Sequence, residues 1–182
     1  PYHLRENMLM RIRREETNAK EGRPAGITMK MNSLSDPQMM DALLSAAKAG
    51  VPVRLMVRGI CCLRYKEHEN LKIYSTVGRF LEHPRIYCFE NLGEKEVFLS
   101  SADLMPRNLD KRIELTVPVK DPKIKAQIIS ILELGFLDNR KLWQLKRANQ
   151  YERVIRDEPA INQQEELIRS PNPLLDRQFL PG

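Results

Sequence analysis

The chain has 182 residues, of which 42% are hydrophobic and 30% are charged, a composition typical of one compact globular domain with an appendage. No stretch approaches the roughly 18 consecutive apolar residues of a membrane-spanning helix, and the three cysteines form no CxxC pair, which supports neither a disulfide framework nor a zinc site. The formal net charge of +6 favours an anionic partner: a nucleotide, a polyanion, a nucleic acid or a membrane surface.

The first part of the chain predicts a β-α-β unit. A helical pattern over residues 2–21 precedes ITMKMN at 27–32, which alternates like a strand. A helix follows a cap at Ser35 or Asp36, and VPVRLMVRG at 51–59 is a near-continuous apolar run, typical of a strand covered on both faces. We therefore expect two neighbouring parallel strands that are joined by a helix.

Polar residues gather at the carboxyl ends of these two strands. Lys30 and Asn32 end the first strand, and Arg58 and Gly59 end the second. In open α/β sheets this edge is where ligands bind. An arginine that ends a buried strand also needs an anion or a carboxylate to meet it. Arg58 is therefore either a ligand contact or one partner of a structural salt bridge.

The rest of the chain predicts further strands, a helix and a tail, so the fold class is α/β. Strands are expected at 71–77, 85–90, 96–102 and 112–119, with NLGEKE as a hairpin connection. Asp121 and Pro122 begin a last helix, which ends near Asn139. We expect one domain over residues 1–140 and a C-terminal tail over 141–182, partly helical or extended, which packs through Trp143.

His83 is the first candidate site residue, and it lies between Arg79 and Arg85 in GRFLEHPRIY. Histidine can act as a nucleophile or as an acid or base near neutral pH, and guanidinium groups bind phosphate oxygens and neutralise their charge. The same pattern also fits a histidine that is hydrogen-bonded within a loop. The sequence therefore leaves a phosphate site and a structural role open.

A second candidate is SSADLMPRNLDKRIE at residues 100–114. Its small residues would let the backbone approach a ligand closely, and Arg107 and Arg112 would present guanidinium groups to an anion. A solvated charged loop is the alternative. The phosphate-binding pattern GxxxxGK[ST] does not occur in the chain, which excludes a P-loop kinase.

Three long segments, in this order, resemble the final catalytic domain of bacterial polyphosphate kinases, which elongate inorganic polyphosphate from ATP. The segments are MKMNSLSDPQMMDALLSAAKAGVPVRLMVRGICCL, VGRFLEHPRIY and VFLSSADLMPRNLDKRIEL. The resemblance extends from about residue 1 to residue 140 and more loosely along the tail. It implies a phospholipase-D-like fold, a mixed sheet flanked by helices, in which a His-x-Lys/Arg motif and a small-residue turn form a phosphate site.

The resemblance also implies roles for individual residues. HPR at 83–85 matches the His-x-Lys/Arg motif and SSAD at 100–103 matches the small-residue turn, with Arg85 and Asp103 where phospholipase D usually has lysine and asparagine. Both departures favour the kinase branch. Arg58 and His83 match positions that contact ATP in the family. We expect Arg58 to hold the nucleotide phosphates and His83 to be the catalytic residue that gives a proton or hydrogen bond to the bridging oxygen.

From their charge and position, we expect Arg85, Arg107 and Arg112 to line a path for polyphosphate. Further expectations follow from the resemblance. The family carries its phosphorylated histidine and Mg²⁺ ligands on a preceding domain, so we expect no metal ligand in this chain and an inactive fragment. The expected partners are ATP or ADP, inorganic polyphosphate, the preceding domains and further copies in a homo-oligomer, without nucleic acid. The expected location is the cytoplasm, either free or peripheral to the inner membrane.

One segment departs from the family pattern. A Gly/Pro-rich loop usually follows the position of RGICCLR, whereas this chain has the short, charged YKEHEN.

Two other functions also remain open. A phospholipase-D-like nuclease or phosphodiesterase half-domain, completed by dimerisation, would use His83 as well. A non-catalytic polyanion-binding module would bind in a salt-sensitive way that ignores His83.

Overall fold

The computed structural model describes residues 3–64, 68–157 and 159–171. Three features of the sequence lie outside these residues: the expected start of the first helix at Tyr2, the beginning of the YKEHEN loop at 65–67, and the end of the tail at 172–182. Among the described helices, none is long and apolar enough to cross a membrane.

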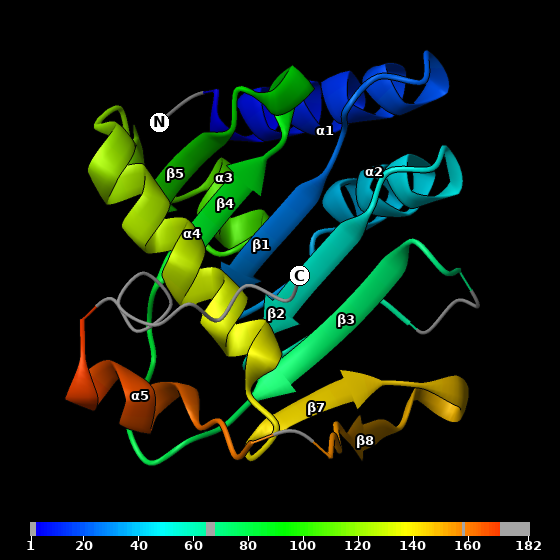
Figure 1. Cartoon of the computed structure of the whole chain (residues 1–182). Helices are drawn as coiled ribbons and strands as arrows, with labels where there is room; N and C mark the ends of the chain where they lie inside the picture. The colour runs from blue at the N-terminus through cyan, green and yellow to red at the C-terminus, as the bar shows by residue number, and fades with distance from the viewer. Residues whose placement is uncertain (1–2, 65–67, 158, 172–182) are drawn as a thin grey trace.

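Within the described residues, eight strands form one mixed sheet in the order β6-β5-β4-β1-β2-β3-β7-β8 (Figure 1). The strands are β1 (Ile27–Met31), β2 (Val53–Val57), β3 (Leu71–Thr76), β4 (Arg85–Phe89), β5 (Glu96–Ser100), β6 (Thr116–Pro118), β7 (Leu142–Leu145) and β8 (Tyr151–Arg153). The central strands β1, β2 and β3 are parallel, and the other pairs are antiparallel. The predicted parallel pairing of the first two strands is confirmed.

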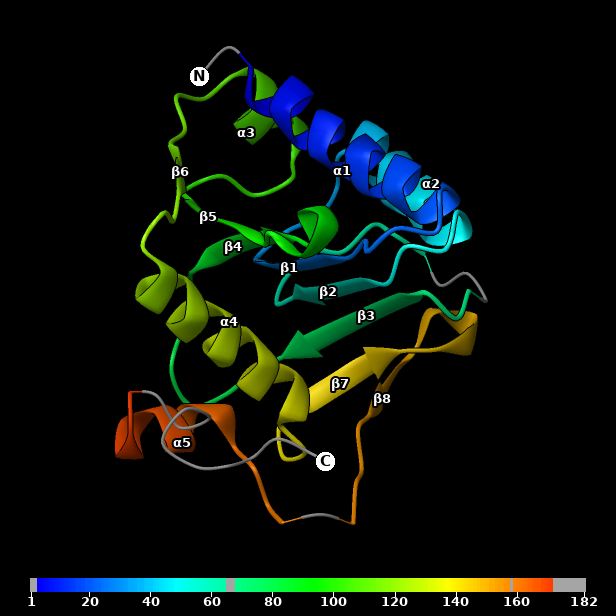
Figure 2. The ribbon, with the colours of Figure 1, turned by 45° about the horizontal axis from the view of Figure 1, so that its top comes forward.

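Helices cover both faces of the sheet, with α1 and α2 on one face and α4 on the other (Figure 2). The helices of the described residues are α1 (Leu4–Lys20), α2 (Pro37–Lys48), α3 (Pro106–Asp110), α4 (Pro122–Leu137) and α5 (Gln163–Arg169). Asp36, not Ser35, caps α2, because its side chain accepts from the Met39 amide at 3.0 Å. Asp121 caps α4 as predicted. The expected fold class, an α/β mixed sheet flanked by helices, is confirmed.

Alternating side chains of a strand belong to hydrophobic cores on opposite faces of the sheet. On β4, Tyr87 and Phe89 belong to the large core between the sheet and α1 and α2. Ile86 and Cys88, on the other face, pack against Ile128 and other residues of α4. Each fully buried large apolar side chain stabilises the fold by about 1.5–3 kcal/mol relative to an exposed one. This two-sided burial explains why the strand sequences read as nearly continuous apolar runs.

Between β5 and α4 the structure differs from the sequence prediction in two respects. The polar loop expected between the strands at 96–102 and 112–119 contains the short helix α3, which begins at Pro106 and has Leu109 as its buried apolar residue. The strand expected over 112–119 is limited to β6, at Thr116–Pro118. A five-residue helix shows too little periodicity to be recognised from sequence.

The segment after residue 140 adds two strands to the sheet. β7 pairs with β3, and β8 pairs with β7. Leu142 and Leu145 are the buried side chains of β7, whereas Trp143 is 42% exposed, so the segment does not pack through Trp143 as expected. The division of the chain at residue 140 stays a prediction, although β7 and β8 share the sheet with β1–β6.

Candidate functional site

The predicted site residues converge on one edge of the sheet. β1 and β2 end there, and β4 begins there because it runs antiparallel to β1, with Lys30 opposite Ile86. β5 ends at the same edge, where Ser100 pairs with Arg85. Segments that are far apart in the sequence, around Arg58, His83 and residues 100–103, therefore meet at the carboxyl ends of the parallel strands.

The end of β1 and the end of β2 are joined by direct contacts. The Gly59 amide donates to the Asn32 carbonyl at 2.8 Å, and Arg58 Nε donates to Asn32 Oδ1 at 2.9 Å. A Cβ at Gly59 would lie 2.9 Å from the Asn32 carbonyl oxygen, closer than such atoms approach, so only glycine fits this turn. The expected clustering of these residues with Lys30 is confirmed.

Arg58 has no carboxylate partner among the described residues, where its polar contact is with Asn32. The structural salt bridge that the sequence left open is therefore absent from the described part of the chain. Beside it, Asn32 Nδ2 is buried and has no hydrogen-bond partner in the described structure. Such an unpaired buried donor costs about 1–3 kcal/mol. A half-buried guanidinium and a spare amide donor thus lie together at this edge.

Arg85 connects His83 to Asp103. Its Nε and Nη2 donate to the two Asp103 oxygens at 3.2 and 2.8 Å, and its Nη1 lies 2.7 Å from His83 Nδ1 and 3.0 Å from the His83 carbonyl oxygen. The side chains of Arg85 and Asp103 retain only 10% and 9% of their accessible surface. The His83 side chain is exposed. Arg85 is thus a buried connector, and His83 is the group that faces outward.

This contact decides the proton position on a neutral His83. A guanidinium has donors and no acceptor, so His83 Nδ1 must accept the hydrogen bond from Arg85 Nη1. The ring proton of the neutral side chain then resides on Nε2. His83 therefore presents an N–H donor, rather than a lone pair, at its exposed ring nitrogen.

Asp103 holds Arg85 in place and is itself fixed by backbone amides. Its Oδ1 accepts from the Asn32 amide at 2.8 Å and the Ser33 amide at 3.0 Å. Burial favours the neutral carboxyl, yet the hydrogen bonds from Arg85, Ser33 and Asn32 outweigh it and hold the pKa of Asp103 below its ordinary value. Asp103 thus links the turn after β5 to the end of β1.

Lys30 and Glu82 form a second ion pair beside His83. The Lys30 side chain is buried in the sheet, and its ammonium bonds a Glu82 carboxylate oxygen. The other Glu82 oxygen accepts from Gln164 Nε2 at 2.8 Å. Neither Glu82 nor Gln164 was among the predicted site residues. For Glu82, the one sequence feature that could have indicated a role is its position next to His83. Gln164 lies 82 residues beyond Glu82, and no sequence feature indicated a role for it.

Arg107, in α3, and Arg112, two residues after the end of α3, lie near each other in the segment that follows β5. The Arg112 amide donates to the Arg107 carbonyl at 3.0 Å, and both side chains are exposed. No ion pair binds either guanidinium within the described residues. The turn is fixed by Ser101 Oγ and Asn108 Nδ2, which both donate to Glu114. The backbone that carries the two arginines is therefore fixed by hydrogen bonds, and within the described residues their guanidinium groups form no ion pair.

Within the described part of the chain, the cavity at the site edge is too small for a ligand. The cavity lined by Lys30, Asn32, Arg58, Glu82 and Pro84 has a volume of about 10 Å³, whereas ligand pockets usually measure about 300–1,000 Å³.

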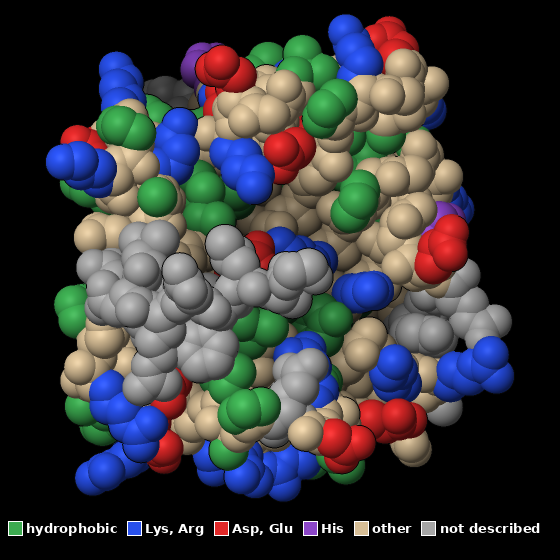
Figure 3. All heavy atoms as spheres, viewed as in Figure 1, with side chains coloured by type: hydrophobic (Ala, Val, Ile, Leu, Met, Phe, Trp, Pro, Cys, Tyr) green, Lys and Arg blue, Asp and Glu red, His purple; other side chains and the backbone are tan. Residues whose placement is uncertain are grey.

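On the face shown in Figure 3, acidic and basic side chains are interspersed with hydrophobic ones. Among the described residues, no group of three or more His, Cys, Asp or Glu side chains could hold a metal ion.

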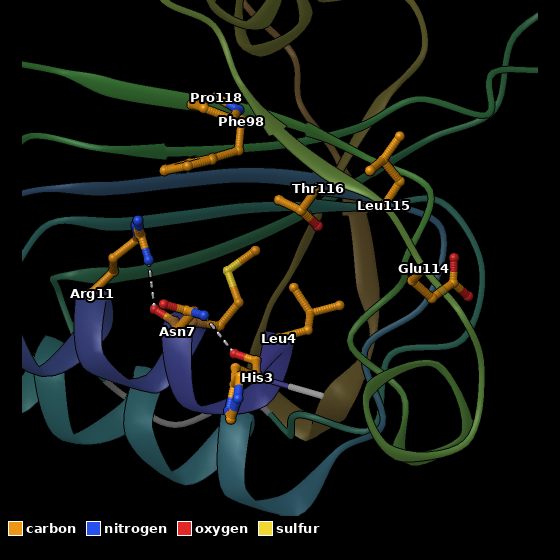
Figure 4. Close-up of a pocket in the computed structure, with 10 residues that line it drawn as sticks. His3, Leu4, Asn7, Arg11, Phe98, Glu114, Leu115, Thr116 and Pro118 are labelled. Atoms are coloured by element: carbon orange, nitrogen blue, oxygen red, sulfur yellow. Dashed lines mark hydrogen bonds between the residues drawn. The ribbon is translucent and has the colours of Figure 1, made fainter. Parts of the chain in front are cut away.

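A larger cavity, of about 490 Å³, lies elsewhere, between α1 and the β5–β6 pair (Figure 4). His3, Asn7 and Arg11 of the α1 region and Phe98 and Thr116 of the strands line it, and the Arg11 guanidinium stacks on the Phe98 ring at 4.5 Å. None of the five predicted site residues lines this cavity. We therefore place the candidate site at the open strand edge.

Comparison with known proteins gives consistent matches. Residues 1–164 match the family model described as polyphosphate kinase C-terminal domain 2. The chain is 42% identical over 172 residues to polyphosphate kinase 1 of Chlorobaculum tepidum, covering 93% of this chain and 25% of that protein. It is 45% identical over 154 residues to the polyphosphate kinase of Synechocystis, covering 83% and 21%.

A solved structure matches over the same extent. The crystal structure of polyphosphate kinase from Porphyromonas gingivalis superposes with a TM-score of 0.89 at 39% identity, and the match covers 93% of this chain and 26% of that chain. The chain thus spans about a quarter of the length of the relatives it matches.

Proposed function

The chain belongs to the polyphosphate kinase family, as its C-terminal domain 2, and from this premise we propose that it is the nucleotide-holding part of an ATP:polyphosphate phosphotransferase. The reaction would transfer the terminal phosphate of ATP reversibly to inorganic polyphosphate. The observation that carries the proposal is the juxtaposition of an unpaired Arg58 with the ordered His83–Arg85–Asp103 arrangement at one sheet edge. Phosphoryl transfer depends mainly on positioning and charge neutralisation, which this edge supplies.

Arg58 is assigned to the phosphates of the nucleotide. Its Nε is held by Asn32, which leaves the terminal Nη groups of the guanidinium for phosphate oxygens. The unpaired Asn32 Nδ2 beside it offers a further donor when the side chain shifts toward a ligand. Charge-assisted hydrogen bonds of this kind are about twice as strong as neutral ones.

His83 is assigned to the leaving oxygen. In the proposed first step, a histidine nitrogen on a preceding domain attacks the γ-phosphorus, a P–N bond forms, and the bond to the β,γ-bridging oxygen breaks. ADP departs with the electron pair on that oxygen, and the His83 Nε2–H donates a hydrogen bond to it. In the second step a terminal oxygen of polyphosphate attacks the phosphorus, so a P–O bond forms and the P–N bond breaks.

Polyphosphate is assigned to Arg107 and Arg112. Their exposed guanidinium groups are unpaired within the described structure, which suits a densely charged polyanion. Arg85 was expected on the same path, but its donors are already directed at Asp103 and His83. We therefore assign Arg85 to the positioning of His83 rather than to polyphosphate.

The open edge supports a site that is completed from elsewhere in a longer polypeptide. An exposed His83 and a cavity of about 10 Å³ leave the phosphates uncovered, and phosphoryl transfer requires water to be kept away from them. The described residues contain no cluster of three or more His, Cys, Asp or Glu side chains that could hold a metal ion by itself. We propose that a preceding domain brings both the cover and the metal ligands.

A binding and labelling experiment tests the proposal. Titration calorimetry of the 182-residue chain with ATP should show at least about tenfold weaker binding for Arg58→Ala and for His83→Ala, because each removes a phosphate contact worth roughly 1.4 kcal/mol or more. Arg13→Ala removes the same charge from an exposed position of α1 and serves as the control. Incubation with γ-labelled ATP should leave the chain unlabelled.

Three results would count against the proposal. Equal ATP affinity for all three variants would remove Arg58 and His83 from the nucleotide site. Cleavage of a chromogenic phosphodiester without ATP, lost in His83→Ala, would instead support a phospholipase-D-like hydrolase. Label on the chain that disappears in His83→Ala would make His83 a nucleophile, contrary to the N–H donor inferred from its contact with Arg85.

A further inference from the structure

The loop that carries His83 has few attachments of its own. It spans residues 77–84 between β3 and β4, and most of its side chains are exposed, with Val77 at 67% and Leu81 at 76%. Within the described part of the chain, no hydrogen bond joins a backbone group of this loop to another backbone group. Segments with so few buried or bonded groups open easily. Something else must hold His83 where Arg85 can reach it.

A single side chain from the C-terminal segment supplies the missing backbone contacts. Gln164, in α5, accepts from the Phe80 amide through Oε1 and donates to the Phe80 carbonyl through Nε2, both at 2.8 Å. The second Nε2 proton goes to Glu82 Oε1 at 2.8 Å. All three hydrogen bonds end within the loop, and Figures 1 and 2 show the loop passing beside α5.

Gly78 keeps the space that this contact requires. A Cβ built on Gly78 would overlap the Gln164 amide group, with Nε2 only 2.7 Å away. The three nearest atoms to that Cβ all belong to Gln164. Glycine at position 78 therefore serves the approach of this one side chain, because its own backbone is not in the left-handed region.

The helix that carries Gln164 is itself fixed to the domain. The Gln163 amide donates to Asp138 Oδ2 at 2.9 Å, and the Gln163 side chain donates to the Ile131 carbonyl at 3.1 Å. The Asn139 amide donates to the Ile161 carbonyl at 3.1 Å. These bonds join α5 to the C-terminal half of α4, so Gln164 projects from an anchored support.

We propose that Gln164 is a positioning residue for His83: the C-terminal segment holds the 77–84 loop in the conformation that lets Arg85 orient the imidazole. On the other side of the loop, Glu82 is tied to Lys30 of β1, so the loop is held between the sheet and α5. The inference rests on the proposed role of His83 in nucleotide binding. Without Gln164 the loop samples other conformations, and the apparent affinity falls with the fraction that stays competent.

The test compares Gln164→Ala with Glu165→Ala, a neighbouring exposed position whose side chain contacts Asn162. In Gln164→Ala, the Phe80 amide should exchange its hydrogen at least about tenfold faster, and ATP affinity should fall by about tenfold for a competent fraction near one tenth. The ring resonances of His83 should shift, while those of His3 and His68 stay as internal references. Glu165→Ala should match the unmodified chain in every measurement.

Gly78→Ala gives a second, independent variant that leaves the C-terminal segment intact. It should reproduce the faster exchange and weaker binding, because its Cβ displaces the Gln164 side chain. In the Gln164→Ala background the same change should add less than about twofold, since the overlap is gone. Additive losses would overturn the inference, because they would mean that the two positions act separately.

The outcomes separate this inference from the proposed function. Unchanged Phe80 exchange in Gln164→Ala overturns the positioning role. The positioning role is also overturned if exchange rises and His83→Ala weakens ATP binding while Gln164→Ala does not. If His83→Ala leaves ATP affinity unchanged, the proposed function of His83 fails first, and the positioning role fails with it.

Discussion

Replacing Asp103 with asparagine perturbs the arrangement behind His83 with almost no change in shape. The carboxylate accepts four hydrogen bonds, from Arg85 Nε and Nη2 on one side and from the Asn32 and Ser33 amides on the other. An asparagine has one acceptor oxygen and one donor nitrogen. Whichever way the amide points, its NH₂ group faces existing donors, and at least one of the four contacts becomes repulsive.

The expected cost follows from the burial of the pair. Removing one partner of a buried ion pair costs about 3–5 kcal/mol, because the remaining charge is left unpaired. Arg85 retains 10% of its side-chain surface, so water can solvate its guanidinium only in part. Since the asparagine keeps part of the hydrogen bonding, we expect a loss near the lower limit, about 3 kcal/mol in the free energy of unfolding.

The effect should depend on pH in one direction. The pKa of Asp103 is lowered in the folded chain, so its charge stabilises the fold fully above the unfolded pKa of about 3.9 and loses this effect as the pH falls through the lower folded value. The difference between the two proteins should therefore be constant from pH 7 to pH 5. It should shrink only below about pH 4.

Urea unfolding followed by circular dichroism measures this difference. Glu16→Gln is the control, since it breaks the surface pair of Glu16 with Lys20, which is 62% exposed, and should cost about 0.3–0.5 kcal/mol. A difference below about 1 kcal/mol for Asp103→Asn at pH 7 would refute the reasoning. So would a difference that is the same at pH 7 and at pH 2, because below the unfolded pKa of about 3.9 the unfolded chain binds a proton at Asp103 and the stabilising effect of its charge decreases.

Three further predictions concern single residues. Gly59→Ala should destabilise the chain by about 1–3 kcal/mol in urea unfolding, because its Cβ meets the Asn32 carbonyl; an unchanged midpoint would contradict the close approach. Nitrogen-15 spectra should show the neutral form of the His83 ring protonated at Nε2, and an Nδ1-protonated pattern would contradict its contact with Arg85. Iodoacetamide at pH 8 should modify exposed Cys62 first, because burial raises the pKa of Cys88 to about 11 and also raises the pKa of Cys61; equal labelling of Cys88 by mass spectrometry would contradict this.

Local patterns in the sequence predicted the elements whose determinants are local. The β-α-β unit with its parallel strands, the cap at Asp121 and the hairpin between β4 and β5 all follow from periodicity and capping residues within a short window. The choice between Ser35 and Asp36 needed the structure, because both side chains can cap a helix. Short elements such as α3, β7 and β8 gave too few residues for a period to show.

The connections behind His83 were beyond the sequence pattern for a different reason. The pair of Arg85 with Asp103 and the contact of Gln164 with Phe80 join residues 18 and 84 positions apart, and no spacing rule relates them. From sequence alone a charged residue is predicted to be exposed to solvent, because its buried partners are known only from the fold. Arg85 illustrates this: its sequence context suggested a polyphosphate contact, whereas its burial and its partners make it a connector.

The direction of β4 is what converts these separate motifs into one site. Arg58 directly follows β2, and His83 precedes β4, 25 residues later. Because β4 is antiparallel to β1, its first residue lies at the edge where β1 and β2 finish. A parallel β4 of the same five residues would place Arg85 at the opposite edge, about 13 Å away over four steps of about 3.3 Å. The antiparallel pairing also sets Arg85 opposite Ser100, which brings Asp103 within reach and so orients His83 from behind.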